Sequence, residues 1–333
     1  MAMIRDFGKG SAGEPVEAVT IRAGGLSAVL LTWGARLQDL RLAGTPWPLV
    51  LGAPTMAGYL GPMRNFGAVV GPVANRIAGA SAVIAGERFH FDRNENGRTT
   101  LHGGAKGSHA RNWRIAEAGD DHVTFTLDLP DGEEGFPGNR QLVAAYRVTA
   151  PDTLSLTLSA TTDRATLLNL APHPYWNLDG TADVAGHHLQ VAASRYTPTD
   201  AALIPTGDVA DVTGSRHDFR TGRDLDTTRD LDVNLCLADA ARDLTQAAVL
   251  EGAKGVRMVL STTEPGLQLH DATRMDTAPQ IGLTGQPYGP RAGIALEPQL
   301  WPDACHHPHF PSIMLEPGTR RDQVTRMAFA RAG

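Results

Sequence analysis

The chain has 333 residues, of which 42% are hydrophobic and 20% are charged, so it is long enough and apolar enough to bury a large core. Its formal net charge of -6 gives no electrostatic footprint for nucleic acid or for an anionic membrane surface. No uncharged apolar run approaches the length of about 18 residues that a membrane span requires. We therefore expect a globular protein that binds neither nucleic acid nor a membrane.

The cellular compartment is indicated by the N-terminus and the cysteines. Residues 1–11 include Arg5, Asp6 and Lys9 and lack the apolar stretch of a secretory signal. The two cysteines, Cys236 and Cys305, are too few for a disulfide framework. Both observations favour a reducing compartment, and we expect a cytoplasmic protein.

Strand patterns dominate the chain from its start. Residues 28–33 and 37–42 form two short apolar segments around Gly34, which predicts a strand, a turn and a second strand. From 123 to 129, apolar residues alternate with Thr and Asp, which is the period of a half-buried antiparallel strand. The same period returns over 154–160.

Turn-forming residues at 150–153 separate that last run from a similar one over 142–148, which predicts a β-hairpin. Only residues 238–250 have a composition with high helix propensity, and Gly252 and Gly255 follow closely. Because strand and helix patterns do not alternate, an α/β fold loses its main support. We expect a large antiparallel all-β architecture in one domain, residues 1–333.

His173 is a candidate functional residue because of its neighbours. It lies between Pro172 and Pro174, which restrict the backbone, and Tyr175 and Trp176 follow it. A lone histidine is usually a packed or surface residue. The two aromatic side chains, however, could form a wall on which a sugar ring stacks.

Glu297 is a second candidate, directly after the apolar run 293–296. A carboxylate in this position is usually a solvent-exposed residue at the end of a strand. Pro298 and Trp301 would shield Glu297 from water and raise its pKa towards the range of a useful general base.

Metal-ligand residue types occur at short spacing near the C-terminus, at Asp303, Cys305, His306, His307 and His309. On an extended segment, His307 and His309 would share a face while His306 points away, so at most part of the cluster could converge. No second group of cysteines and histidines is available to complete a tetrahedral set, and we expect no bound metal.

Several short motifs follow one another along the chain. They are GPVANRI at 71–77, NENG at 94–97 leading to LHGG at 101–104, DGEEGFPG at 131–138, the His173 loop, DVNL at 232–235, STTEPGLQ at 261–268 and the Glu297 loop. Any one of them would be a weak signal. Together and in this order they resemble the aldose 1-epimerase (galactose mutarotase) family over nearly the whole chain.

The resemblance implies a large antiparallel β-sandwich of the galactose-mutarotase type that binds a free monosaccharide without a metal or an organic cofactor. It implies that Glu297 is the general base and His173 the general acid. It further implies that the sugar hydroxyls and ring are held by Asn75, Arg76, His102, Asp232 and Gln268.

This chemistry is the interconversion of sugar anomers, which requires opening a cyclic hemiacetal, turning about C1–C2 and reclosing the ring. Glu297 would take the proton of the C1 hydroxyl while a protonated His173 gives one to the ring oxygen, and the roles reverse on closure. Arg76 and His102 would hold or polarise oxygens around the reacting centre.

The sequence departs from the family's usual pattern next to these residues. Pro172 and Pro174 flank His173 where Asn and Ser are common, Pro72 stands where Arg is usual, and residues 269–272 read Leu-His-Asp-Ala instead of Tyr-Thr-Gly-Asn. None of these changes removes a proposed catalytic group. They bear on the preferred sugar, because they shape the pocket.

Three alternatives remain open. A sugar-phosphate epimerase on the same fold should add cations for the phosphate, and no such cluster stands beside the motifs. A non-catalytic carbohydrate-binding protein would use Tyr175, Trp176 and Trp301 for stacking, but it needs no acid and base pair. A metal-dependent hydrolase would rest on the spacing of residues 306–309 alone.

Overall fold

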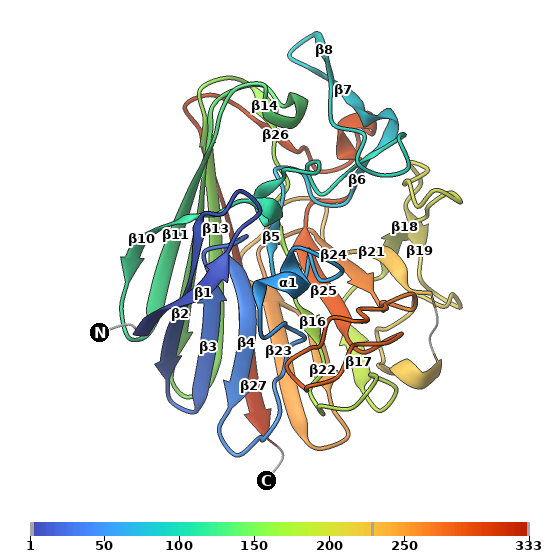
Figure 1. Cartoon of the computed structure of the whole chain (residues 1–333). Helices are drawn as coiled ribbons and strands as arrows, with labels where there is room; N and C mark the ends of the chain where they lie inside the picture. Colours follow the sequence, from blue (N-terminus) through green and yellow to red (C-terminus); the bar gives the residue numbers. More distant parts are fainter. Residues whose placement is uncertain (1–2, 228–229, 332–333) are drawn as a thin grey trace.

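The computed structural model describes residues 3–227 and 230–331, and antiparallel β-strands dominate it (Figure 1). Within these residues three larger sheets form the body of the molecule. The first has four strands: Met3–Lys9 (β1), Pro15–Ala23 (β2), Leu26–Leu31 (β3) and Arg36–Leu42 (β4).

The second sheet has nine strands in the order β10-β11-β12-β13-β27-β23-β22-β17-β20. In that order they are Arg114–Ala118, His122–Leu129, Arg140–Thr149, Thr153–Thr162, Arg320–Arg331, Val256–Thr262, Thr245–Glu251, His188–Val191 and Arg223–Asp224.

The third sheet has six strands in the order β16-β25-β24-β21-β18-β19. In that order they are Tyr175–Trp176, Ile294–Gln299, Gly266–His270, Asp232–Cys236, Arg195–Thr197 and Ala210–Asp211.

Short strand pairs and single helical turns connect the sheets. The pairs are Val69–Val70 (β5) with Ala171–Pro172 (β15), Arg76–Ile77 (β6) with Thr100–Leu101 (β9), Ser81–Ile84 (β7) with Glu87–His90 (β8), and Thr166–Leu167 (β14) with Met314–Leu315 (β26). The α-helical turn is Met56–Tyr59 (α1), and the 3-10 turns are Ala78–Ala80 (η1), Ser108–Ala110 (η2), Glu133–Gly135 (η3), Leu225–Thr227 (η4) and Ala304–His306 (η5). None of the described helices is long and apolar enough to cross a bilayer.

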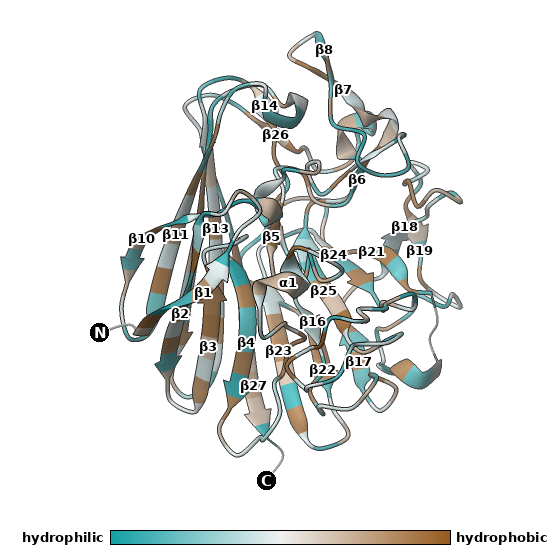
Figure 2. Cartoon of the chain, viewed as in Figure 1, coloured by the Kyte–Doolittle hydropathy of each residue, from teal (hydrophilic) through white to brown (hydrophobic). Residues whose placement is uncertain are grey.

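The main core lies between the nine-stranded sheet and the other two sheets. One buried cluster joins Ile21 of β2, Phe125 of β11, Leu260 of β23, Leu269 of β24 and Phe329 of β27. Figure 2 shows polar and apolar residues alternating along strands such as β4 and β11. This alternation places one face of each strand in the core and the other outside it, and the predicted antiparallel β-sandwich is confirmed.

The strands predicted from alternation are present. β3 and β4 occupy the predicted apolar segments, and the turn between them requires Gly34, whose φ is 77° and whose Cβ would lie 2.7 Å from the carbonyl oxygen of His109. β11 covers residues 123–129, and β12 and β13 form the predicted hairpin.

Helix propensity at 238–250 was misleading. Residues 245–250 belong to β22, which pairs with β17 on one side and β23 on the other, and the preceding residues form a loop. The apolar side chains of Ala248 and Leu250 join the core from this strand. Tertiary pairing overrides local propensity here.

Candidate active site

The polar face of the six-stranded sheet carries three of the predicted site residues. Residues opposite each other in an antiparallel pair share a face, as do residues two apart on a strand. Gln268 lies opposite Glu297, and Asp232 lies opposite His270. Because Gln268 and His270 are two residues apart on β24, all four side chains emerge from the same face.

The intervening residues point the other way, into the core. Val233, Leu267, Leu269 and Leu296 alternate with the polar positions and belong to the main buried cluster. Burial of this apolar set fixes the register, since a slip of one residue would bring the polar side chains into the core. The hydrophobic face therefore determines where the functional face lies.

His173 lies between β15 and β16, close to this polar face. Its backbone N–H donates to the carbonyl oxygen of Ala68 at 2.9 Å, and its own carbonyl oxygen accepts from the N–H of Gly67 at 2.8 Å. These bonds tie the histidine to the loop that precedes β5. Tyr175 follows in β16, opposite Ala295 of β25, and its ring centroid lies 5.1 Å from that of His173.

The predicted aromatic wall is only half correct. Tyr175 lines the cavity described below. Trp176, the next residue on the strand, points to the opposite face, is fully buried, and packs its ring against Phe329 with centroids 5.9 Å apart. The prediction for Trp176 was wrong because adjacent residues of a strand alternate between faces.

Arg76 begins β6, Asn75 directly precedes this strand, and His102 directly follows β9, with which β6 pairs. The N–H of His102 donates to the carbonyl oxygen of Asn75 at 3.0 Å, and the N–H of Asn75 donates to His102 Nδ1 at 3.2 Å. Because Nδ1 accepts, the proton of the neutral ring lies on Nε2, which remains available as a donor. Burial holds the pKa of His102 well below its usual range.

All seven predicted site residues line one cavity of about 150 Å³, namely Asn75, Arg76, His102, His173, Asp232, Gln268 and Glu297. Asn65, Leu101, Tyr175 and His270 complete its lining. Asn65 has no signal in the sequence, because it lies in a loop that only tertiary contacts bring to the cavity. His270 stood out only as a departure from the usual pattern after Gln268.

A charged network fixes one side of the cavity. Arg76 donates from Nε and from a terminal nitrogen to the two oxygens of Glu95, at 2.9 and 2.8 Å, and another terminal nitrogen lies 3.7 Å from an oxygen of Asp232. The side-chain amide of Gln268 donates to Asp232. A bidentate pair of this kind holds the guanidinium in one orientation. Glu95 belongs to the NENG motif, but no role was predicted for it.

Glu297 and His173 face each other within this cavity. His173 Nε2 lies 3.6 Å from Glu297 Oε1, and the two residues are only 4% and 2% exposed. Burial raises the pKa of Glu297 well above its usual range, and the negative charge of Asp232 adds to this while Arg76 opposes it. Burial, with a smaller contribution from His270, lowers the pKa of His173 to about 3.

In the sugar-free cavity, burial therefore opposes the protonated form of His173 that the predicted acid role requires. Desolvation disfavours the charged form of each group, which favours a neutral imidazole and a protonated carboxyl. Two groups this close titrate as a pair, and one proton is shared between them.

Glu297 is buried as predicted, but for a different reason. It lies inside β25 and not at its end. Pro298 alternates to the opposite face, and Trp301 packs its ring against Phe310 and donates its indole N–H to the carbonyl oxygen of Pro265. The walls of the cavity, and not these two residues, exclude water from Glu297.

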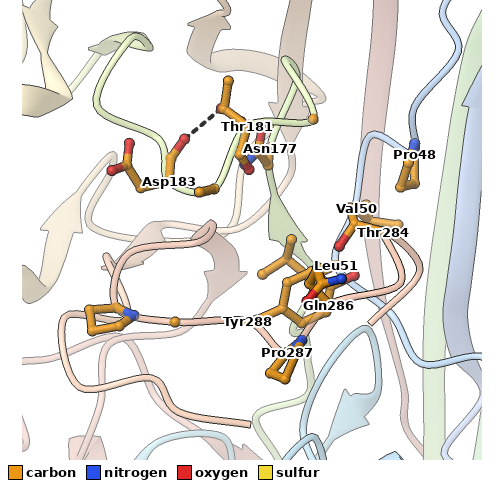
Figure 3. Close-up of a pocket in the computed structure, with 14 residues that line it drawn as sticks. Pro48, Val50, Leu51, Asn177, Thr181, Asp183, Thr284, Gln286, Pro287 and Tyr288 are labelled. Carbon is orange, nitrogen blue, oxygen red and sulfur yellow. Dashed lines mark hydrogen bonds between the residues drawn. The ribbon is translucent and has the colours of Figure 1, made fainter. Parts of the chain in front are cut away.

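Besides a cavity of about 270 Å³ lined by residues such as Gly24 and Pro151, two larger cavities are present. One of about 480 Å³ adjoins the site and shares Arg76, Tyr175, Asp232 and His270 with it. The other, of about 420 Å³, contains none of the predicted residues and is lined by segments that include Val50, Asn177, Asp183, Gln286 and Tyr288 (Figure 3). In this second cavity the hydroxyl of Thr181 donates to the carbonyl oxygen of Asp183.

Comparison with known proteins defines the class of this fold and site. The structure superimposes on an aldose epimerase homologue from C. elegans with a TM-score of 0.88 and 29% identity, covering 95% of this chain and 100% of that one. A galactose 1-epimerase from Lactobacillus acidophilus shares the fold, with a TM-score of 0.84, 23% identity and coverage of 100% and 99%. The molecule is thus an all-β protein of the galactose-mutarotase type.

The sequence comparisons identify the family within this fold class. The aldose 1-epimerase family profile matches residues 17–328. Galactose mutarotase from Rattus norvegicus is 34% identical, over 97% of this chain and 96% of its own. Aldose 1-epimerase from Escherichia coli (strain K12) is 32% identical, over 95% and 96%. The chain belongs to the aldose 1-epimerase family, and the prediction of an isomerase of this class is confirmed.

Proposed function

We propose that this protein interconverts the α and β anomers of a free aldose, with Glu297 and His173 as the proton-transfer groups. The observation that carries this proposal is the pair itself, a carboxyl and an imidazole 3.6 Å apart in a buried cavity otherwise lined mainly by hydrogen-bonding side chains. Sequence relatives named galactose mutarotase and aldose 1-epimerase support the same reaction.

The reaction suits two groups that lie side by side. The C1 hydroxyl oxygen and the ring oxygen are bonded to the same carbon, so the group that removes one proton and the group that supplies the other must be neighbours. As the bond between C1 and the ring oxygen breaks, the C1 hydroxyl loses its proton and the ring oxygen gains one. Rotation about C1–C2 and the reverse transfers close the ring on the other face.

One shared proton is enough for this step. With the carboxyl protonated, transfer of its proton to His173 on sugar binding produces the carboxylate and imidazolium pair, which hydrogen bonds to the C1 hydroxyl and the ring oxygen would stabilise. Glu297 then accepts the C1 hydroxyl proton while His173 donates to the ring oxygen. The number of protons on the pair is unchanged over a complete turnover.

The remaining residues bind and orient the sugar in this proposal. His102 donates from Nε2, Asn75 and Gln268 can donate or accept, and Asp232 accepts from sugar hydroxyls. Arg76, held by Glu95, places positive charge near the oxygen on which negative charge develops. Tyr175 offers a ring face for the apolar side of the sugar.

The alternatives find less support in this geometry. Arg76 already contacts two carboxylates, Glu95 and Asp232, so a phosphate would meet no free cation in the smaller cavity. A purely stacking site would need Trp176 and Trp301, and both are buried in cores away from it.

Polarimetry of freshly dissolved α-anomers tests the reaction. We expect the protein to accelerate mutarotation of at least one of glucose, galactose, xylose and arabinose. Glu297→Gln and His173→Asn should each lower kcat by at least roughly a hundredfold, since one general acid or base contributes about 10²–10⁴-fold. The double variant should fall well short of the product of the two losses, because both groups act in one step.

Glu264→Gln is the matched control, because Glu264 is a buried carboxyl that does not line the cavity. It should leave kcat within a few-fold of the original. Sugar binding, measured by calorimetry, should persist in all variants. Near-normal kcat in a folded Glu297→Gln protein would refute the role of Glu297, and no acceleration with any of the four sugars would favour a binding protein.

A further inference from the structure

The turn that follows the active-site strand β25 brings three metal-ligand side chains together. Asp303 has a left-handed backbone with φ of 56°, and the 3-10 turn η5 begins directly after it. His306 Nδ1 lies 2.7 Å from Asp303 Oδ1, and Cys305 Sγ lies 3.7 Å from His306 Nδ1 and 3.9 Å from Asp303 Oδ1. The sequence-based expectation that His306 points away assumed an extended backbone, and this turn removes that objection.

These separations approach the edges of a tetrahedral site. Zinc binds oxygen and nitrogen at about 2.0–2.1 Å and sulfur at about 2.3 Å, which places ligand atoms about 3.3–3.6 Å apart. The two distances from Cys305 Sγ are within a few tenths of an ångström of that range. The third distance, between His306 Nδ1 and Asp303 Oδ1, is that of a hydrogen bond, and it would lengthen by about 0.6 Å when both atoms bind an ion instead.

The surroundings support a bound ion. Asp303 is 2% exposed, and its Oδ1 accepts the N–H of Ala78 at 3.0 Å, which orients the carboxylate from a neighbouring segment. His307 Nε2 lies 3.7 Å from Asp303 Oδ2 and is buried without a hydrogen-bond partner. The His306 side chain is 33% exposed, which leaves a path for an ion to enter.

We propose that Asp303, Cys305 and His306 bind one divalent ion of the Zn²⁺ and Co²⁺ class. A thiolate with an imidazole and one carboxylate suits these ions, whereas Mg²⁺ and Ca²⁺ prefer sets of oxygen ligands. Water takes the fourth position. This metal site is separate from the active site, because none of the three ligands lines the sugar cavity or the cavity that adjoins it.

Cobalt absorption spectroscopy tests this site without relying on activity. Metal-free protein titrated with Co²⁺ should bind one equivalent and develop the intense visible bands of a tetrahedral site with a thiolate-to-cobalt charge-transfer band. Cys305→Ser should abolish the charge-transfer band. His306→Ala should weaken Co²⁺ binding by at least roughly 10-fold. Removal of a residue that only supports a metal ligand already costs about 10–100-fold in affinity, and removal of a ligand should cost no less.

Cys236→Ala is the matched control, since Cys236 is the other cysteine and is buried in β21 outside the turn. It should keep the full charge-transfer band. Cys305→Ser and exhaustively chelated protein should keep their mutarotation rates, which also shows that they are folded. The proposal is overturned if the original protein shows no charge-transfer band at millimolar Co²⁺, or if the band survives in Cys305→Ser.

Discussion

At the scale of single residues, burial changes which protonation states Glu297 and His173 adopt. If both side chains were exposed, Glu297 would be a carboxylate at neutral pH and His173 would have a pKa near 6.5. In the cavity the pKa of Glu297 is raised and that of His173 is lowered to about 3. We therefore expect the pair to hold one proton between the lowered pKa of His173 and the raised pKa of Glu297.

This state predicts that His173 does not titrate near neutral pH in the sugar-free protein. We expect its imidazole nitrogens to keep the ¹⁵N chemical shifts of a neutral ring from pH 8 down to pH 5. His173→Asn identifies the signals by removing them. A protonation midpoint near 6.5 for His173 would contradict the effect of burial that we infer.

The same state predicts which residue sets the alkaline limb of the pH profile. As pH rises through the raised pKa of Glu297, the pair loses its only proton and kcat/KM should fall. The residual activity of His173→Asn should keep this limb, and that of Glu297→Gln should lose it. Mutarotation rates of both variants, corrected with buffer blanks at each pH, show which residue sets the limb. If the limb is lost in His173→Asn and kept in Glu297→Gln, it belongs to His173.

At the scale of elements, a buried arginine holds the loop that reaches the cavity. Arg36 is fully buried, and its guanidinium donates to the carbonyl oxygens of Trp33, Met63, Arg64 and Phe66 and, at a longer distance, to that of His109. Burial lowers its pKa to about 10. The loop it holds carries Asn65 to the cavity and contacts the backbone of His173.

Arg36→Met should destabilise the protein strongly. It leaves several buried carbonyl groups without donors, each at a cost of about 1–3 kcal/mol, so we expect the free energy of unfolding to fall by at least about 3 kcal/mol. Urea unfolding measures this loss. Arg41→Met is the control, because the Arg41 side chain is 40% exposed and its ion-pair partner among the described residues is Asp39, and it should change stability by less than about 1 kcal/mol.

A buried histidine in the short turn η2 should make the stability of the fold sensitive to acid. His109 is 5% exposed, and burial lowers its pKa to about 3. Below pH 6.5 the unfolded chain binds a proton that the folded protein excludes, so stability is complete above pH 6.5 and is lost as pH falls towards 3. At pH 5 this one residue costs about 2 kcal/mol relative to neutral pH.

His109→Gln should therefore lose less stability than the original protein between pH 7 and pH 5, by about 2 kcal/mol. Urea unfolding at both pH values gives the difference. His90→Gln, which changes an exposed histidine of β8, is the matched control. Equal losses in the original protein and in His109→Gln would mean that His109 takes up a proton within the fold.

At the scale of the whole molecule, the last strand joins distant parts of the chain. β27 pairs with β13 on one side and with β23 on the other. The main buried cluster runs from Val19 to Phe329. We propose that residues 1–333 form one domain, since no described segment of the core is complete without strands from both halves of the chain.

A single domain should unfold in one cooperative step. We expect the calorimetric and van't Hoff enthalpies of thermal unfolding to agree, and near- and far-ultraviolet circular dichroism to give coincident transitions. Leu260→Ala in β23, at the centre of the core, should lower the midpoint of the whole transition. Two resolved transitions, with only one of them shifted by Leu260→Ala, would show that the chain contains two separate folding units.

Much of this protein is determined by short-range patterns in its sequence. Alternation along 123–129 and 154–160 predicted strands that are present. The ordered motifs carried the resemblance to the family, and that resemblance implied the seven residues that share the cavity. These properties are local: a period of two assigns side chains to faces, and a motif requires only its own residues.

The tertiary structure decided what depends on distant neighbours. Residues 245–250 became a strand because β17 and β23 pair with them, despite their helix propensity. The lowered pKa of His173 and the raised pKa of Glu297 follow from desolvation by walls drawn from many segments, which no local pattern records. The convergence of Asp303 and His306 depends on a backbone turn that an extended reading of the same residues had excluded.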